Sequence, residues 1–357
     1  MDARAGAAAS ATGGAGAAFG PAAAVERAVR FLERSQLPDG AFRVYTSSAP
    51  DMSGACLDDA SVFPTALIAH CLAFAPAAAA ARQRAVGFLA KEMDRHGLWR
   101  HWTREHPQYA QLPPDLDDTS CASAVLAHAG RPFPDNRRLL LANRRSDGRF
   151  LTWIIPRPRL AAPAHMKVTL PQLVHLPTLW LFFRRTSASP ADIDAVVNAN
   201  VLHYLGPGAH GDRVARWLVQ VLRDNRERQC DKWYENPFAI WYFFARALGA
   251  TVPEAGDIIE ARIAAAEPAT SLDAALAVAA LSSLGRTVSI GVVERLLEAQ
   301  LPDGAWPRAA LYHGGRARLK DGGFGEPHPD TPRWGSEELT TAFCVEALSR
   351  LAGPDAA

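Results

Sequence analysis

The chain has 357 residues, of which 48% are hydrophobic and 21% charged. This composition is typical of a globular protein with a large core and excludes an intrinsically disordered chain. Lys and Arg number 38 and Asp and Glu 37, so the net charge of +1 indicates no nucleic-acid-binding surface. The apolar runs are shorter than the about 20 residues that cross a bilayer, so we expect no transmembrane segment.

The first 20 residues are rich in Ala and Gly and lack the basic start and apolar stretch of a secretion signal. We predict that residues 1–20 form a disordered tail and that the protein is cytoplasmic. The 5 cysteines are scattered and form no Cys-x-x-Cys pair, which excludes a disulfide framework and a zinc knuckle.

Helices are predicted along the whole remaining chain, in two alternating classes. The first class has apolar residues at helical spacing and covers residues 22–35, 85–92, 137–144, 213–225, 254–265 and 290–299. After each comes a turn and then a more apolar helix; these second helices are expected to begin near Asp59, Asp118, Asp192 or Asp194, Asn236, Ser271 and Glu337. No segment shows a convincing strand alternation.

An internal repeat defines how these helices are organised. Gln36-Leu-Pro-Asp-Gly-Ala-Phe42 recurs as Gln300-Leu-Pro-Asp-Gly-Ala-Trp306, each time after a helix. Repeated hairpins that bury each other's faces close into one ring, so the repeat overrides the roughly two domains that the length alone predicts. The predicted fold class is all-α, with one (α/α)6 barrel of six helical hairpins over residues 21–353.

Three carboxylates stand together between the helices of the second hairpin, in Pro113-Pro114-Asp115-Leu116-Asp117-Asp118-Thr119. Asp118 or Thr119 is expected to cap the following helix. Capping explains one or two of these acids but not three, because crowded carboxylates raise at least one pKa. A carboxyl that keeps its proton near neutral pH is what acid catalysis requires. Acids at other expected helix starts are interpreted as caps, and only the second hairpin adds Asp115 and the Thr; those other acids are Asp58, Asp59, Asp273 and Glu337.

These motifs resemble two signatures of the terpenoid cyclases. Gln36–Phe42 and Gln300–Trp306 resemble the Gln-x-x-x-Gly-x-Trp repeats, and Asp115–Thr119 resembles the Asp-x-Asp-Asp-Thr motif of class II terpene cyclases. The resemblance implies an α-barrel in which Asp117 protonates a terminal alkene while Asp115 and Asp118 tune or orient it. Family members usually have two barrels, whereas this chain has the length of one. That difference indicates a smaller substrate, a partner chain or homo-oligomer that closes the cavity, or lost activity.

Further residues are candidates for binding the substrate. Aromatic faces stabilise carbocations, and Trp99, Trp180, Tyr234 and Trp306 are the main candidates; the wider set also includes Trp153, Phe182, Phe183, Trp233, Trp241, Phe243 and Phe244. The alternative for each is a place in the core.

Polar and basic residues complete the candidates. Asn198 and Asn200, on a predicted inner helix, are expected to bond the acid cluster, or to hold a metal or a structural network. Arg316, Arg318 and Lys320 lie on a Gly-rich loop and are expected to neutralise a diphosphate, unless the loop is only a solvated excursion.

The predicted function is protonation-initiated cyclisation of an isoprenoid, with a C15 or C20 prenyl diphosphate favoured over squalene. No cofactor is required, although Mg²⁺ is compatible with a diphosphate, and no Asp/Cys/His zinc set is present. One alternative is a non-catalytic barrel that binds an isoprenoid or a protein. Another is an inverting glycosidase in which Asp117 pairs with Asp194 or Glu338.

Overall fold

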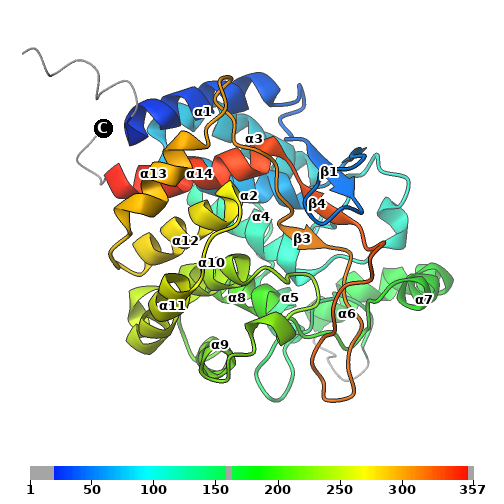
Figure 1. Ribbon diagram of the computed structural model, residues 1–357. Coiled ribbons are helices and arrows are strands. Elements are labelled where there is room, and N and C mark those ends of the chain that lie inside the picture. The colour runs from blue at the N-terminus through cyan, green and yellow to red at the C-terminus, as the bar shows by residue number, and fades with distance from the viewer. Residues whose placement is uncertain (1–19, 158–162, 353–357) are drawn as a thin grey trace, which may run out of the picture.

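The computed structural model describes residues 20–157 and 163–352 and is mostly helical (Figure 1). Residues 1–19 of the expected tail lie outside the described residues. No helix in the described part of the chain is long and apolar enough to cross a membrane.

Six helices form an inner ring in this part of the chain. Each packs against the next, and the last returns to the first, which closes the ring. Their residues are buried nearly all round, as expected for helices with neighbours on every side. They are α2 (Phe63–Cys71), α4 (Leu116–His128), α8 (Ala195–Leu205), α10 (Pro237–Leu248), α12 (Ser271–Ser283) and α14 (Glu337–Ala352).

An outer helix precedes each inner helix along the chain. In α9, Val214, Leu218 and Leu222 are buried on one side, while Arg216 and Gln220 are exposed on the other. This amphipathic pattern confirms the alternation of outer and inner helices, and with it the predicted all-α (α/α)6 fold. The outer helices are α1 (Pro21–Ser35), α3 (Ala79–Glu92), α5 (Arg137–Ala142), α9 (Asp212–Arg223), α11 (Pro253–Ala265) and α13 (Ile290–Glu298).

The glutamine of each repeat motif ties its turn to the neighbouring outer helix. Gln36 Nε2 donates a hydrogen bond of 2.9 Å to the carbonyl of Ala81 in α3. Gln300 Nε2 donates one of 2.9 Å to Ala24 in α1. Because α13 comes near the end of the chain and α1 at its beginning, the second of these bonds joins the last repeat to the first.

The aromatic residue of the motif packs between an outer and an inner helix. The Trp306 indole donates to Leu296 in α13 at 2.7 Å, and its backbone N–H donates to the Thr341 hydroxyl in α14 at 3.0 Å. Trp99 makes the same two kinds of bond, to α3 and, at 3.2 Å, to Thr119 in α4. In these two hairpins the aromatic residue therefore joins the outer helix to the inner one.

A small antiparallel sheet corrects the prediction that the chain has no strands. Its order is β2 (Leu57–Asp59), β1 (Val44–Ser47), β4 (Arg333–Gly335) and β3 (Tyr312–His313). Strands of two to four residues are too short to show an alternating pattern. The expected helix start near Asp59 is also wrong, because that residue belongs to β2 and the helix begins at Phe63.

Between α5 and α8 the chain makes an excursion that the repeat did not predict. It contains α6 (Pro163–Thr169), a 3-10 helix (Leu170–His175) and α7 (Leu176–Arg185). In Figure 1, α7 lies on the same side of the helical layers as the sheet. Sheet and excursion thus frame one end of the ring.

Candidate active site

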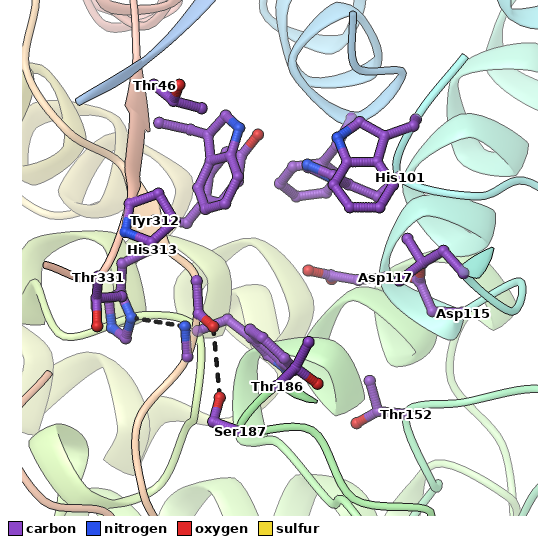
Figure 2. Close-up of a pocket in the computed structure, with 18 of the residues that line it drawn as sticks. Thr46, His101, Asp115, Asp117, Thr152, Thr186, Ser187, Tyr312, His313 and Thr331 are labelled. Atoms are coloured by element: carbon purple, nitrogen blue, oxygen red, sulfur yellow. Dashed lines mark hydrogen bonds between the residues drawn. The ribbon is translucent and has the colours of Figure 1, made fainter. Parts of the chain in front are cut away.

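A cavity of about 870 Å³ opens at the N-terminal ends of the inner helices. Its floor includes Phe63 at the start of α2 and Asp117 at the start of α4. The sheet contributes Tyr312 and Trp334, and α7 contributes Phe182. Figure 2 shows Asp117 pointing into the space that Tyr312 and His101 border.

The acid cluster begins with a helix cap. Asp115 has extended backbone angles and is the N-cap of α4, accepting a hydrogen bond of 2.9 Å from the Asp118 backbone N–H. The prediction that Asp118 or Thr119 caps this helix was therefore wrong, because the helix starts at Leu116, earlier than expected. Asp115 thus caps the helix, so neither Asp117 nor Asp118 is needed as its N-cap.

The threonine after the acids belongs to the repeat. Thr65 in α2 accepts a hydrogen bond of 3.0 Å from the Phe42 backbone, as Thr119 does from Trp99. The expectation that only the second hairpin has such a threonine was wrong. In this register Asp117 corresponds to Phe63, because each stands two residues before the threonine. A cavity-facing position that is apolar in α2 thus carries a carboxyl in α4.

Two side chains hold the Asp117 carboxyl. Asn200 Nδ2 donates to Oδ1 at 2.5 Å, and the Tyr234 hydroxyl donates to Oδ2 at 3.0 Å. Arg246 donates to the Asn200 carbonyl oxygen at 2.5 Å. A guanidinium only donates hydrogen bonds, so this contact fixes which end of the Asn200 amide faces Asp117.

Burial keeps a proton on this cluster. It raises the pKa of Asp117 to about 7, and the charge of Asp115 adds to the effect, against the hydrogen bonds from Asn200 and Tyr234. Burial likewise raises the pKa of Asp115 and, still further, that of Asp118. Asp115 and Asp118 are only 5% and 3% exposed, whereas Asp117 is partly accessible. All three line the cavity, and Asp117 is the most accessible of them.

Aromatic rings form the walls around this carboxyl. The rings of Tyr312 and Trp334 stack with centroids 5.3 Å apart, and Phe63 meets Tyr312 edge-on at 5.5 Å. Another wall has Trp153 and Trp233 at 5.8 Å. Both walls line the cavity, so aromatic rings border the space that Asp117 faces.

The predicted aromatic residues divide between cavity and core. Of the four main candidates, Tyr234 lines the cavity, together with Trp153, Phe182 and Trp233 from the wider set. Trp99 and Trp306 do not line it, because they are buried in the repeat packing. Trp180 does not line it either and is 59% exposed.

The predicted polar residues also separate. Asn200 contacts Asp117, whereas Asn198 bonds the Phe150 backbone and does not line the cavity. The basic loop, contrary to expectation, turns its charges away from the cavity. Arg316 donates to the backbone carbonyls of Asp231 and Tyr234, Arg318 lines a different pocket, and Lys320 is exposed. The described residues that line the cavity include one arginine, Arg185.

The structure also places residues here that the sequence did not assign to the substrate site, among them Asp59, which was interpreted as a helix cap. Asp59 accepts the indole N–H groups of Trp102 at 3.2 Å and Trp334 at 2.6 Å, and lies 3.3 Å from His106 Nε2. His101 faces the cavity, and burial lowers its pKa to about 4, so it is neutral at neutral pH. Loops and short strands bring these residues together, and the one local signal is the aromatic cluster around His101.

Two other predictions concern carboxylates and metals. Asp194 and Glu338, considered as partners of Asp117 in a glycosidase, do not line the cavity. Asp194 instead accepts hydrogen bonds from Thr152, the Trp233 indole and the Lys232 backbone. Among the described residues, no group of three His, Cys, Asp or Glu side chains is arranged to hold a metal ion.

Comparison with known proteins rests on the fold. By sequence, no family profile and no curated protein matches the chain. The solved structure of a protein from Actinoplanes is 22% identical, with a TM-score of 0.61, and the match covers 93% of this chain and 100% of that one. Type II terpene cyclase MstE from Scytonema is 18% identical, with a TM-score of 0.61. The match covers 93% of this chain and 98% of that one.

A longer enzyme matches over part of its length. The ent-copalyl diphosphate synthase from Streptomyces platensis is 20% identical, with a TM-score of 0.53, and the match covers 82% of this chain and 50% of that one. The near-complete coverage of MstE shows that the fold of a terpene cyclase is complete in one barrel of this length. The chain has a class II terpene cyclase-like fold.

Proposed function

We propose that the protein is a class II terpene cyclase in which Asp117 protonates a polyprenyl chain. The observation that carries the proposal is the position of this carboxyl. It is partly accessible at the floor of an aromatic cavity, and burial raises its pKa to about 7. At neutral pH a large fraction of the enzyme then holds the proton that the reaction needs.

In the first step, the O–H bond of Asp117 breaks and a C–H bond forms at the terminal alkene, whose π electrons take the proton. The carbocation lies at the neighbouring carbon, and further alkenes of the chain attack it to close rings. Ring faces of the cavity walls, such as Tyr312, stabilise each cation by about 0.5–2 kcal/mol. Hydrogen bonds from Asn200 and Tyr234 stabilise the carboxylate that remains.

The last cation loses a proton or is captured by water. His101 is our candidate for the base, because it faces the cavity and its pKa, lowered to about 4 by burial, leaves it neutral. His101 then gives its proton to solvent, and solvent returns one to Asp117, so the cycle closes without a redox group.

We propose a C15 or C20 polyprenyl substrate without a diphosphate. The cavity volume of about 870 Å³ is in the usual range for small-molecule sites. Its lining includes the acids Asp59, Glu326 and Asp330. Among the described lining residues there is one arginine, Arg185. This charge balance disfavours a free diphosphate, and a substrate without a diphosphate does not call for Mg²⁺. MstE has been solved with geranylgeranyl dihydroxybenzoate as its substrate, a prenyl chain on an aromatic head group.

Product analysis in D₂O tests the proposal. The purified protein is incubated with geranylgeranyl dihydroxybenzoate, farnesyl diphosphate, geranylgeranyl diphosphate and squalene, and products are identified by mass spectrometry and NMR. We expect a cyclic product from a diphosphate-free prenyl arene, with one deuterium at the former terminal alkene. Release of diphosphate without deuterium uptake contradicts protonation. Binding of these compounds without turnover favours the alternative of a non-catalytic isoprenoid-binding barrel.

A further inference from the structure

A second cavity, of about 540 Å³, lies at the opposite end of the inner ring. Five inner helices end there with a basic residue in the last turn, and the outer helix α3 adds Arg82. The residues that line it include no Asp or Glu within the described part of the chain. Its basic residues are His70, Arg82, His128, His203, Arg246 and Arg350.

Helix dipoles explain part of this arrangement. The C-terminal end of a helix attracts cations, by about 0.3–1 kcal/mol each, which suits residues such as Arg350. Arg82 does not fit this explanation, because it stands in the first turn of α3, where the dipole repels a cation. A separate cause is needed for its position at this cavity.

The guanidinium groups here have few counter-charges. Arg82 has no ion pair or hydrogen bond within the described part of the chain, and its buried Nε atom has no partner. Arg246 bonds Asn200 and Cys121 but no carboxylate of a described residue lies within 4.0 Å of it, and its Nε also lacks a partner. Of the three, Arg350 alone has an ion pair, with Glu346 at 2.8 Å.

The histidines respond to the same environment. Burial, followed by the charge of Arg246, lowers the pKa of His203 to about 3 and that of His70 well below its usual value. Nε2 of His70 is buried and has no hydrogen-bond partner among the described residues. The cavity thus has an excess of positive charge and, in Arg82, a guanidinium without partners among the described residues. An anion with several oxygens supplies the missing counter-charge and acceptors.

We propose that this second cavity binds an oxyanion of the phosphate class through Arg82, Arg246 and Arg350. A planar guanidinium donates two parallel hydrogen bonds to a phosphate, and a lysine does not supply this geometry. The volume of about 540 Å³ has room for a diphosphate or for a phosphate that carries an organic group. This site is separate from the acid cavity, and its existence does not depend on turnover.

Arg246 connects the two cavities. Its guanidinium lines the second cavity and donates to Asn200, which donates to Asp117 in the first. An anion bound at Arg246 therefore contacts the hydrogen-bond chain that holds the catalytic acid.

Calorimetric titration of the full chain with inorganic diphosphate at constant ionic strength tests the site. We expect saturable binding of one diphosphate per chain, and at least a tenfold loss of affinity in Arg82→Gln. Arg82→Lys keeps the charge but not the paired donors, so we expect an intermediate affinity. Inorganic phosphate distinguishes the size of the bound anion, and chloride is the control for screening alone.

Two matched variants locate the bound anion. Arg286→Gln removes a surface arginine that is paired with Asp257, and Arg185→Gln removes the arginine of the acid cavity. We expect both to bind diphosphate like the parent. Absence of saturable binding, equal affinity in Arg82→Gln, or loss of binding in Arg185→Gln instead would each overturn the proposal. Circular dichroism of every variant establishes that a lost affinity is not a lost fold.

Discussion

The two ends of the inner ring have opposite chemistry. The lining of the N-terminal end is rich in carboxylates and aromatic rings, and that of the C-terminal end has guanidinium and imidazole groups. At both ends the charges on the inner helices follow the helix dipoles in sign, whereas Arg82 of α3 does not. At the acid end, however, the dipole favours ionised carboxylates, whereas burial raises the pKa of Asp115, Asp117 and Asp118. Packing around the helix starts, rather than the dipole, thus decides where the protons stay.

The largest expected effect is that of Asp117→Asn. An amide has no acidic proton to deliver, so we expect cyclisation to fall by several orders of magnitude. The folded pKa of Asp117 is about 7, above its unfolded value, so its contribution to stability declines as the pH rises through 7. The variant should therefore be about as stable as the parent near pH 4, close to the usual pKa of 3.8, and more stable at pH 8, as thermal unfolding at both pH values will show.

Asp273→Asn is the matched control for this variant. Asp273 also stands in the first turn of an inner helix, where it forms a capping box with Thr270 and accepts from two backbone N–H groups. We expect it to keep full turnover and to lose about 0.5–2 kcal/mol of stability. Asp58 is not a suitable control because it lies on β2. Equal turnover in both variants would show that Asp117 is not the acid.

The next largest effect is the pH dependence of the parent's activity. The acid must be protonated to react, and the pKa of Asp117 is about 7. We expect kcat/KM to be level below this pH and to fall about tenfold per unit above it. Steady-state rates between pH 5 and 9 will measure this limb. A rate that rises with pH would instead indicate a base as the essential group.

A smaller effect is expected from Tyr234→Phe, which should shift the descending limb of the pH profile of kcat/KM. The hydroxyl of Tyr234 donates to Asp117 and lowers its pKa, so its removal raises the pKa. A hydrogen bond to a charged group contributes about 1.5–3 kcal/mol, which corresponds to about one to two pKa units. We expect the descending limb to shift upward in pH by about this amount. An unmoved limb would mean that Asp117 does not control the rate.

The sequence predicted features that are local or repeated. The outer helices, the ring and the contiguous acids from Asp115 to Asp118 follow from periodicity and adjacency. The start of α3 was missed, because it lies at Ala79 and the prediction began at residue 85. It missed the short strands and therefore aligned Asp58 and Asp59 with the wrong helix start. The direction of a loop side chain has no local signature, so Arg316 was placed at the substrate although it bonds the backbone beneath.

The smallest expected effects are those of substitutions at the repeat threonines. They distinguish a structural role of Thr119 from a role in the chemistry of the acid cluster. Thr119 and Thr341 each accept a hydrogen bond from the backbone of a buried tryptophan. Valine has the same shape without the acceptor, so each substitution leaves one N–H unsatisfied and should cost about 1–3 kcal/mol. We expect equal losses of thermal stability in Thr119→Val and Thr341→Val, with the pH limb of activity unchanged in both. If Thr119→Val alone abolishes turnover while its stability matches that of Thr341→Val, the threonine acts on the acids and not only on the hairpin.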